Sequence, residues 1–318
     1  MANGRVDPFG DIRADVEAEL QRHFGPDGSG GDVGLAMRES VLAPAKRLRP
    51  LMTVLAARDL GCRSNAALRA GCAVELVHTA SLLLDDLPCM DDAATRRGKP
   101  TIHLRFGEDV AILAAIALLS DAYAMAASLP DVPGEKTAKL VGALSDAIGL
   151  QGLVAGQYRD LHANGAGGED EAVAVNDQKT GSLFVTCLDM AATLAGTDEK
   201  QAERLHRFGR EIGRAFQLYD DLLDVDGDET AMGKARGLDA ERHKLAHRVS
   251  RDAMLDLIRS HVTAARAALA GLPVRPKGLS DLTDHLFGEE EPSPARPARR
   301  VSAEPLLASL LARPLPQA

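Results

Sequence analysis

The sequence has no tryptophan, and aromatic residues make up only 3% of its 318 residues. Alanine and leucine dominate instead, which favours helices packed on helices over β-sheet. The few cysteines, Cys62, Cys72, Cys89 and Cys187, show neither a CxxC pair nor a zinc-like spacing. We therefore expect an all-α protein with reduced thiols, as is usual in the cytoplasm.

The chain also lacks segments typical of export or membrane insertion. Its N-terminus has no basic stretch followed by an apolar one, as a signal peptide would. The longest apolar run, Val110–Leu119, is about half the length of a membrane-spanning helix, so we interpret it as a central core helix. The net charge of −9 argues against a general nucleic-acid surface, which needs basic patches.

Hydrophobic periodicity and turn residues divide the chain into helices. The predicted helices cover Asp11–His23, Arg47–Asp59, Ser64–Leu84, Glu108–Ser128, Glu135–Leu161, Glu169–Ala195, Lys200–Asp224, Arg248–Leu272 and Leu279–Phe287. Gly25–Gly34 is predicted to be a loop, and Asp226–Arg242 a mobile one. We expect one domain over residues 1–288 and a flexible Pro/Arg-rich tail over residues 289–318.

Two aspartate clusters each follow an apolar stretch with helical character. They are Asp85-Asp86-Leu87-Pro88-Cys89-Met90-Asp91-Asp92 and Asp220-Asp221-Leu222-Leu223-Asp224. Two unit negative charges about 4 Å apart repel by roughly 4 kcal/mol at an effective dielectric constant of about 20. Facing clusters on core helices therefore need a cation, and Mg²⁺ suits because it combines a few carboxylates with water and phosphate oxygens. Pro88 places the last aspartates of the first cluster on a bend.

Basic runs occur on either side of the first cluster. They are Lys46-Arg47-Leu48-Arg49-Pro50 and Arg96-Arg97-Gly98-Lys99-Pro100. Guanidinium groups bind phosphate oxygens in a bidentate way, and lysine adds a point charge. Each run alone is more often a solvated face. Metal-binding and anion-binding groups together, however, indicate a diphosphate substrate.

In their order, these stretches resemble the motifs of the trans-isoprenyl diphosphate synthases. The resemblance includes Glu75 and His78 ahead of the first cluster. Three further stretches agree with it, namely Gly156-Gln157-Tyr158-Arg159-Asp160-Leu161, Lys179-Thr180-Gly181-Ser182-Leu183-Phe184 and Phe216-Gln217-Leu218-Tyr219 before the second cluster. The match runs from about Arg38 to Phe287 and implies the isoprenoid-synthase helical bundle around a central active-site cavity, usually as a homodimer.

The resemblance also implies two diphosphate sites. The first binds allylic substrate (dimethylallyl, geranyl or farnesyl diphosphate) through Mg²⁺ ions, three in the family, held by Asp85, Asp86, Asp91, Asp220, Asp221 and Asp224. The same diphosphate would contact Arg96, Lys179, Lys234 and Lys244. The second site binds isopentenyl diphosphate through Lys46, Arg49, His78 and Arg97. Stabilisation of the developing allylic cation falls to Lys179, Thr180 through its carbonyl, and Gln217.

Taken singly, several of these residues have plainer interpretations. His78 on an apolar helix is more often a satisfied core histidine. Gln157 and Arg159 are also consistent with a polar contact between helices. Because the motifs occur together in the family's order, we favour substrate binding over these structural roles.

The size of the residues before the first cluster bears on product length. Ala80 and Ser81 lie about one helical turn before Asp85. In bacterial farnesyl diphosphate synthases that resemble this chain, an aromatic residue takes the place of Ala80 and blocks the pocket. The small side chains here predict geranylgeranyl diphosphate, C20, as in bacterial carotenoid pathways, with Val77 or Val74 as candidates for the next limit.

Two stretches depart from the family pattern. Pro44-Ala45 replaces two glycines before Lys46, and His243 replaces a glycine before Lys244, in a loop that closes over substrate. Alternatives therefore remain: a farnesyl or C25 synthase, a terpene cyclase or head-to-head condensing enzyme, and a non-catalytic subunit of a heteromeric synthase. The cyclase interpretation leaves the separate isopentenyl diphosphate set without a use.

Overall fold

The computed structural model describes residues 7–25, 30–162, 174–230 and 250–288, with backbone only for 223–230. Its helices are α1 (Gly10–Phe24), α2 (Gly31–Val41), α3 (Leu48–Asp59), α4 (Ala66–Asp85), α5 (Ile102–Phe106), α6 (Glu108–Ala127), α7 (Gly134–Ile148), α8 (Leu153–His162), π-helix η1 (Asp177–Gly181), α10 (Ser182–Ala195), α11 (Glu199–Thr230), α12 (Arg251–Ala270) and α13 (Lys277–Phe287). The strands β1 (Thr95–Arg96) and β2 (Lys99–Pro100) form one hairpin. The all-α prediction is confirmed.

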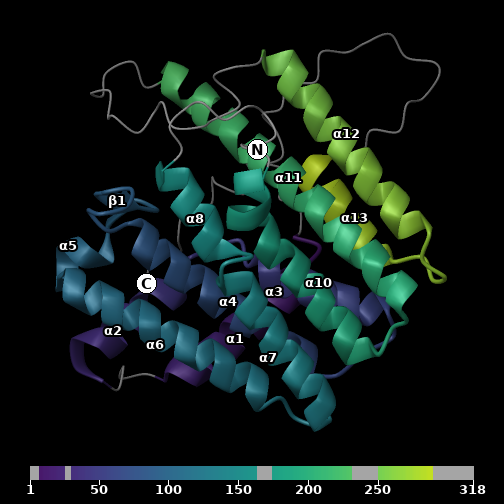
Figure 1. The fold of residues 1–318 in the computed structure, drawn as a ribbon, viewed down its shortest axis with the longest axis horizontal. Coiled ribbons are helices and arrows are strands. Elements are labelled where there is room, and N and C mark those ends of the chain that lie inside the picture. The colour runs from purple at the N-terminus through teal and green to yellow at the C-terminus, as the bar shows by residue number, and fades with distance from the viewer. Residues whose placement is uncertain (1–6, 26–29, 163–173, 231–249, 289–318) are drawn as a thin grey trace, which may run out of the picture.

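Helix α4 lies at the centre of the bundle, packed against α3, α6 and α10 (Figure 1). Most of its residues are buried and apolar, as suits a helix packed against neighbours on several sides. Its approach to α3 depends on Gly71, since a Cβ atom there would lie 2.7 Å from the Cα of Pro50. The aspartate-bearing end of α4 is thus fixed by contacts along most of its length.

The predicted helix Glu135–Leu161 is wrong in its middle. Helix α7 ends at Ile148 and α8 begins at Leu153. The chain between them folds back so tightly that a Cβ atom on Gly152 would lie 1.9 Å from the carbonyl oxygen of Ala147. Only glycine fits there, so the break frees α8 to take its own direction.

Other predicted boundaries also need correction. Residues 31–34 of the predicted Gly25–Gly34 loop belong to α2, which starts after Gly30 in a left-handed conformation (φ 108°). Helix α11 continues to Thr230, into the predicted loop Asp226–Arg242. The rest of that loop, Lys234, Lys244 and the tail 289–318 lie outside the described residues, so the domain boundary at residue 288 stays a prediction.

The hairpin after the first cluster was not predicted. Arg97 and Gly98 form its two-residue turn, with φ values of 54° and 76°. Two successive positive φ angles are typical of a type I′ turn, which matches the twist of the flanking strands. The hairpin places Arg96 on β1 and Arg97 at the turn.

Three segments are long and apolar enough to cross a membrane by length and composition alone: Ala66–Asp85, Glu108–Ala127 and Gly134–His162. In α4, 67% of that apolar window is buried inside the bundle, but in α6 only 39% is. The interpretation of Val110–Leu119 as a central core helix is therefore correct for one face of the helix and wrong for the other. One face of α6, with Ala111 and Leu118, is buried, whereas Ile112 and Ile116 are exposed.

Candidate active site

The first aspartate cluster forms a compact loop on the end of α4. The amide of Asp91 donates to the carbonyl of Asp85 over 2.9 Å, and the amide of Ala93 donates to the carbonyl of Asp86 over 3.2 Å. These bonds fold the chain back after Pro88. Asp91 thereby returns to the neighbourhood of Asp85, as the bend at Pro88 predicts.

The carboxyl group of Asp85 is strongly perturbed by its surroundings. Burial raises its pKa from 3.8 to about 6; Lys179 opposes the rise, and the charge of Asp91 adds to it. Asp91 and Asp86 raise this pKa while Lys179 and Arg96 lower it, and because burial still leaves the pKa raised, additional positive charge would stabilise the ionised carboxylate. The electrostatic demand predicted from the sequence is therefore present at this end of α4.

Asp86 is turned into the protein and is almost fully buried. It accepts three hydrogen bonds from the guanidinium of Arg96 on β1, over 2.6–2.9 Å. The hairpin thus pins Arg96 directly to the cluster. Arg96 keeps part of its side chain at the surface, where 37% is exposed.

The second cluster lies on α11, with Asp220 exposed and Asp221 buried. Asp221 accepts a hydrogen bond of 2.9 Å from the amide of Gln217, whose oxygen accepts one of 2.7 Å from the hydroxyl of Thr180. Nothing is described of the side chain of Asp224. Within the described part of the chain, no three His, Cys, Asp or Glu side chains form a metal-binding group by themselves.

The π-helix η1 links the two clusters. Its Lys179 interacts electrostatically with Asp85 and Asp91 of the first cluster, and its Thr180 is hydrogen-bonded through Gln217 to Asp221 of the second. The predicted catalytic residues therefore lie together between the predicted metal-binding ones. Single π-turns within α-helices are frequent at functional sites.

Lys179 is held by a residue to which the sequence analysis gave no role. Its ammonium donates to the carboxylate of Asp160 on α8 over 2.6 Å. Burial works against the charge of Lys179, but Asp160 and Asp85 outweigh it and raise its pKa. Asp160 belongs to the motif 156–161, so its position was visible in the sequence although its partner was not.

Helix α8 can reach η1 because of Gly156. A Cβ atom there would lie 2.6 Å from the backbone nitrogen of Lys179. Within the part of the chain that the structure describes, the polar contact considered for Gln157 and Arg159 is not found. Arg159 is exposed, and both amide atoms of Gln157 are buried without a partner among the described residues.

On its other side, η1 is tied to α11. Arg214 donates to both carboxylate oxygens of Asp177, over 2.7 and 2.5 Å. Such a bidentate ion pair fixes orientation as well as distance. Neither residue was predicted to take part in the site, and their separation in sequence gave no signal of it.

The second predicted set of cations lies against two aromatic rings. The ammonium of Lys46 is 5.6 Å from the ring centre of Phe216, and the guanidinium of Arg49 is 5.4 Å from that of Phe184. These rings, from α11 and α10, are themselves 5.5 Å apart. Lys46 and Arg49 therefore point towards the same aromatic pair, as two groups of one site would.

Arg49 and His78 are partly buried. Burial lowers the pKa of both groups, and it lowers the pKa of His78 well below its ordinary value, with Arg49 and Arg97 adding to the effect. The Nε atom of Arg49 is buried and lacks an acceptor within the described chain. Buried hydrogen-bond donors are nearly always paired with an acceptor, and a bound anion would provide an acceptor for this one.

Comparison with known proteins agrees with this geometry. A curated geranylgeranyl diphosphate synthase of Pseudescherichia vulneris is 48% identical over 73% of this chain and 76% of its own. Another curated geranylgeranyl diphosphate synthase, of Pantoea ananas, is 43% identical over 81% of this chain and 86% of its own. The crystal structure of an FPP/GFPP synthase from Zymomonas mobilis, in its apo form, matches with a TM-score of 0.76 at 29% identity, covering 88% of this chain and 97% of that one.

The fold and the curated relatives are thus those of an all-α prenyltransferase. The sequence model of the polyprenyl synthetase family matches residues 33–252, and the chain belongs to that family.

Proposed function

We propose that this protein condenses isopentenyl diphosphate with allylic diphosphates, in a Mg²⁺-dependent reaction, and releases geranylgeranyl diphosphate. The observation that carries the proposal is the position of η1, whose Lys179 and Thr180 connect two aspartate clusters. The product follows from the two bacterial relatives and from the small side chain of Ala80. Use of the product in a carotenoid pathway and a cytoplasmic location belong to the same proposal.

The carboxylates at this end of the bundle fit magnesium. They offer only oxygen donors, and burial and Asp91 leave the pKa of Asp85 raised to about 6, so a divalent cation would relieve repulsion. Asp85, Asp91 and Asp220 would hold the ions, while Asp86 and Asp221 are engaged by Arg96 and Gln217. Mg²⁺, when bound, supplies charge neutralisation for the departing diphosphate.

The protein's own groups divide the remaining work between them. Arg96 and Lys179, both positioned by carboxylates, provide donors for the allylic diphosphate oxygens. The carbonyl of Thr180 and the amide oxygen of Gln217 would face the developing allylic cation. Arg49, with a buried donor that lacks an acceptor, would bind the diphosphate of isopentenyl diphosphate beside Lys46, His78 and Arg97.

The proposed function is tested by an assay of prenyl chain elongation. Purified protein is incubated with Mg²⁺, radiolabelled isopentenyl diphosphate and either dimethylallyl, geranyl or farnesyl diphosphate, and the products are sized. We expect C20 product. Absence of any elongation would rule out the proposal, cyclised hydrocarbon would favour a terpene cyclase, and arrest at C15 or passage to C25 would refute the product assignment alone.

Ala80 provides a separate test of chain length. It is fully buried on α4, about one turn before Asp85. Ala80→Tyr should shorten the product to C15 while turnover continues, because the larger ring fills the space needed by longer chains. Ala138→Tyr, on the exposed face of α7, is the matched control and should leave the product at C20.

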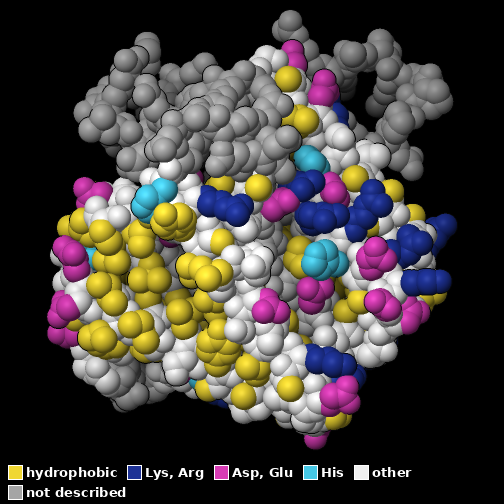
Figure 2. Space-filling view, in the orientation of Figure 1, with side chains coloured by type: hydrophobic (Ala, Val, Ile, Leu, Met, Phe, Trp, Pro, Cys, Tyr) yellow, Lys and Arg dark blue, Asp and Glu magenta, His cyan; other side chains and the backbone are white. Residues whose placement is uncertain are grey.

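We also propose that the protein is a homodimer through the exposed face of α5 and α6. Leu104, Leu113 and Ile116 are 59%, 52% and 58% exposed, and Figure 2 shows hydrophobic side chains gathered over these helices. Apolar patches of this kind mark association sites. Ile116→Arg should give monomers in light scattering, whereas Val274→Arg, on the exposed α12–α13 loop, should not; an unchanged mass for Ile116→Arg would refute the interface.

A further inference from the structure

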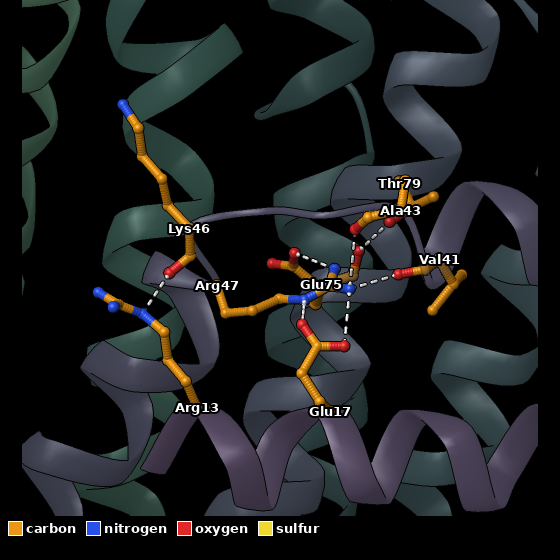
Figure 3. Close-up of polar contacts among 8 residues, drawn as sticks. All are labelled: Arg13, Glu17, Val41, Ala43, Lys46, Arg47, Glu75 and Thr79. Atoms are coloured by element: carbon orange, nitrogen blue, oxygen red, sulfur yellow. Dashed lines mark hydrogen bonds and ion pairs between the residues drawn. The ribbon is translucent and has the colours of Figure 1, made fainter. Parts of the chain in front are cut away.

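Arg47, between the predicted phosphate-binding residues Lys46 and Arg49, faces the opposite way. Only 1% of its side chain is exposed. Its guanidinium donates to Glu17 on α1 over 2.7 and 3.2 Å and to Glu75 on α4 over 3.0 Å (Figure 3). It also donates to the carbonyls of Val41 and Ala43, over 2.6 and 3.2 Å. One side chain therefore ties α1, α4 and the α2–α3 loop together.

The backbone of Arg47 is held in an uncommon conformation. Its φ of 50° and ψ of 38° lie in the left-handed region, at the residue before α3. A non-glycine residue there costs on the order of 1 kcal/mol or more and persists where its surroundings determine it. Burial disfavours its charge, yet Glu17 and Glu75 raise the pKa of Arg47, so the ion pairs outweigh the burial. The contacts of the guanidinium are therefore what holds this turn.

The turn decides where the neighbouring cations point. Figure 3 shows the side chain of Lys46 extending away from the guanidinium of Arg47, while its carbonyl accepts a 3.0 Å hydrogen bond from Arg13 on α1. Lys46 reaches Phe216, and Arg49, in the first turn of α3, reaches Phe184. A change of φ at Arg47 would turn Lys46 relative to α3, so that Lys46 and Arg49 would no longer meet at this aromatic pair.

We propose that Arg47 is a positioning residue: anchored by Glu17 and Glu75, it orients Lys46 and Arg49 for the diphosphate of the non-allylic substrate. The inference rests on the proposed function and concerns only one of its two diphosphate sites. The allylic site, on Arg96 and Lys179, uses other elements and should not respond to Arg47. A role confined to stability would change both substrates alike or neither.

Arg47→Lys is the main test. Lysine keeps the charge but cannot reach both carboxylates and two carbonyls from a single nitrogen. We expect the KM for isopentenyl diphosphate to rise about tenfold, the size of one lost charge-assisted hydrogen bond, with the KM for the allylic substrate within about twofold. Arg266→Lys, which alters the 2.7 Å ion pair with Asp284 far along the chain, is the matched control and should leave both KM values unchanged.

Glu17→Gln is a milder variant, because 34% of the Glu17 side chain is exposed. Glu17→Gln should also raise the KM for isopentenyl diphosphate, but by a smaller factor than Arg47→Lys does. If Arg47→Lys does not fold, the KM values of Glu17→Gln test the role of Arg47 instead. Equal rises in both KM values, or none, in a folded variant would overturn the inference. Failure of the wild-type protein to elongate would overturn the proposed function instead, and calorimetric binding of isopentenyl diphosphate to wild type and variants would still judge Arg47.

Discussion

The packing of α8 against η1 makes Gly156 a sensitive position. In Gly156→Ala the new Cβ atom would lie 2.6 Å from the nitrogen of Lys179 and 3.0 Å from the carbonyl carbon of Gln178, both backbone atoms. Overpacking of this kind costs about 1–3 kcal/mol, against a gain of about 1 kcal/mol from replacing glycine inside a helix. We expect a net loss of up to about 2 kcal/mol in the free energy of unfolding.

The same substitution should impair turnover, because η1 must shift with Lys179 and Thr180. A misplacement of about 1 Å can lower kcat about 100-fold. Urea denaturation and steady-state kinetics with an allylic diphosphate measure the two effects. The matched control is Gly142→Ala in α7, where a Cβ atom would meet nothing within 4 Å.

For Gly142→Ala we expect a gain of about 0.5–1 kcal/mol in the free energy of unfolding and unchanged kinetics. The identical chemical change should therefore have opposite signs at the two positions. Equal stability changes in both variants, or full activity in Gly156→Ala, would show that α8 and η1 are not in the close contact on which the site depends.

Two further predictions concern charged and reactive groups. Asp160 raises the pKa of Lys179, so Asp160→Asn should lower that pKa and move the alkaline limb of the allylic kcat/KM profile to lower pH; an unmoved limb would contradict the role of the pair. Burial raises the pKa of Cys187 to about 12, so iodoacetamide at about pH 8 should leave Cys187 unmodified in the native protein, as followed by peptide mass spectrometry, while the exposed Cys89 reacts. Alkylation of Cys187 before denaturation would contradict its burial.

The helical nature of the chain and the identity of its motifs could be predicted because both are local properties. Apolar periodicity located α4 and α11, and the aspartate clusters, at the end of α4 and within α11, stand out in any window of the sequence. The break between α7 and α8 was missed because it depends on how closely Gly152 approaches the Ala147 carbonyl, a contact that periodicity does not report.

The partners of the site residues could not be predicted, because they are separated by long stretches of chain. Nothing local to Arg47 says that it faces Glu17 and Glu75 while its neighbours face Phe184 and Phe216. A basic run in the sequence does not say in which direction each side chain points. The turn that precedes α3 determines those directions. The same holds for Lys179, whose partner is set by the approach of another helix.

By itself, then, the sequence determined which reactive groups the chain offers: clustered carboxylates, basic runs beside the first cluster, and a small residue at position 80. Tertiary structure alone decided which of these groups meet. Helix η1 lies between the aspartate clusters because Gly156 lets α8 approach it and the Arg214–Asp177 pair ties it to α11. Residue types follow from local sequence, but orientation follows from close packing of elements distant along the chain.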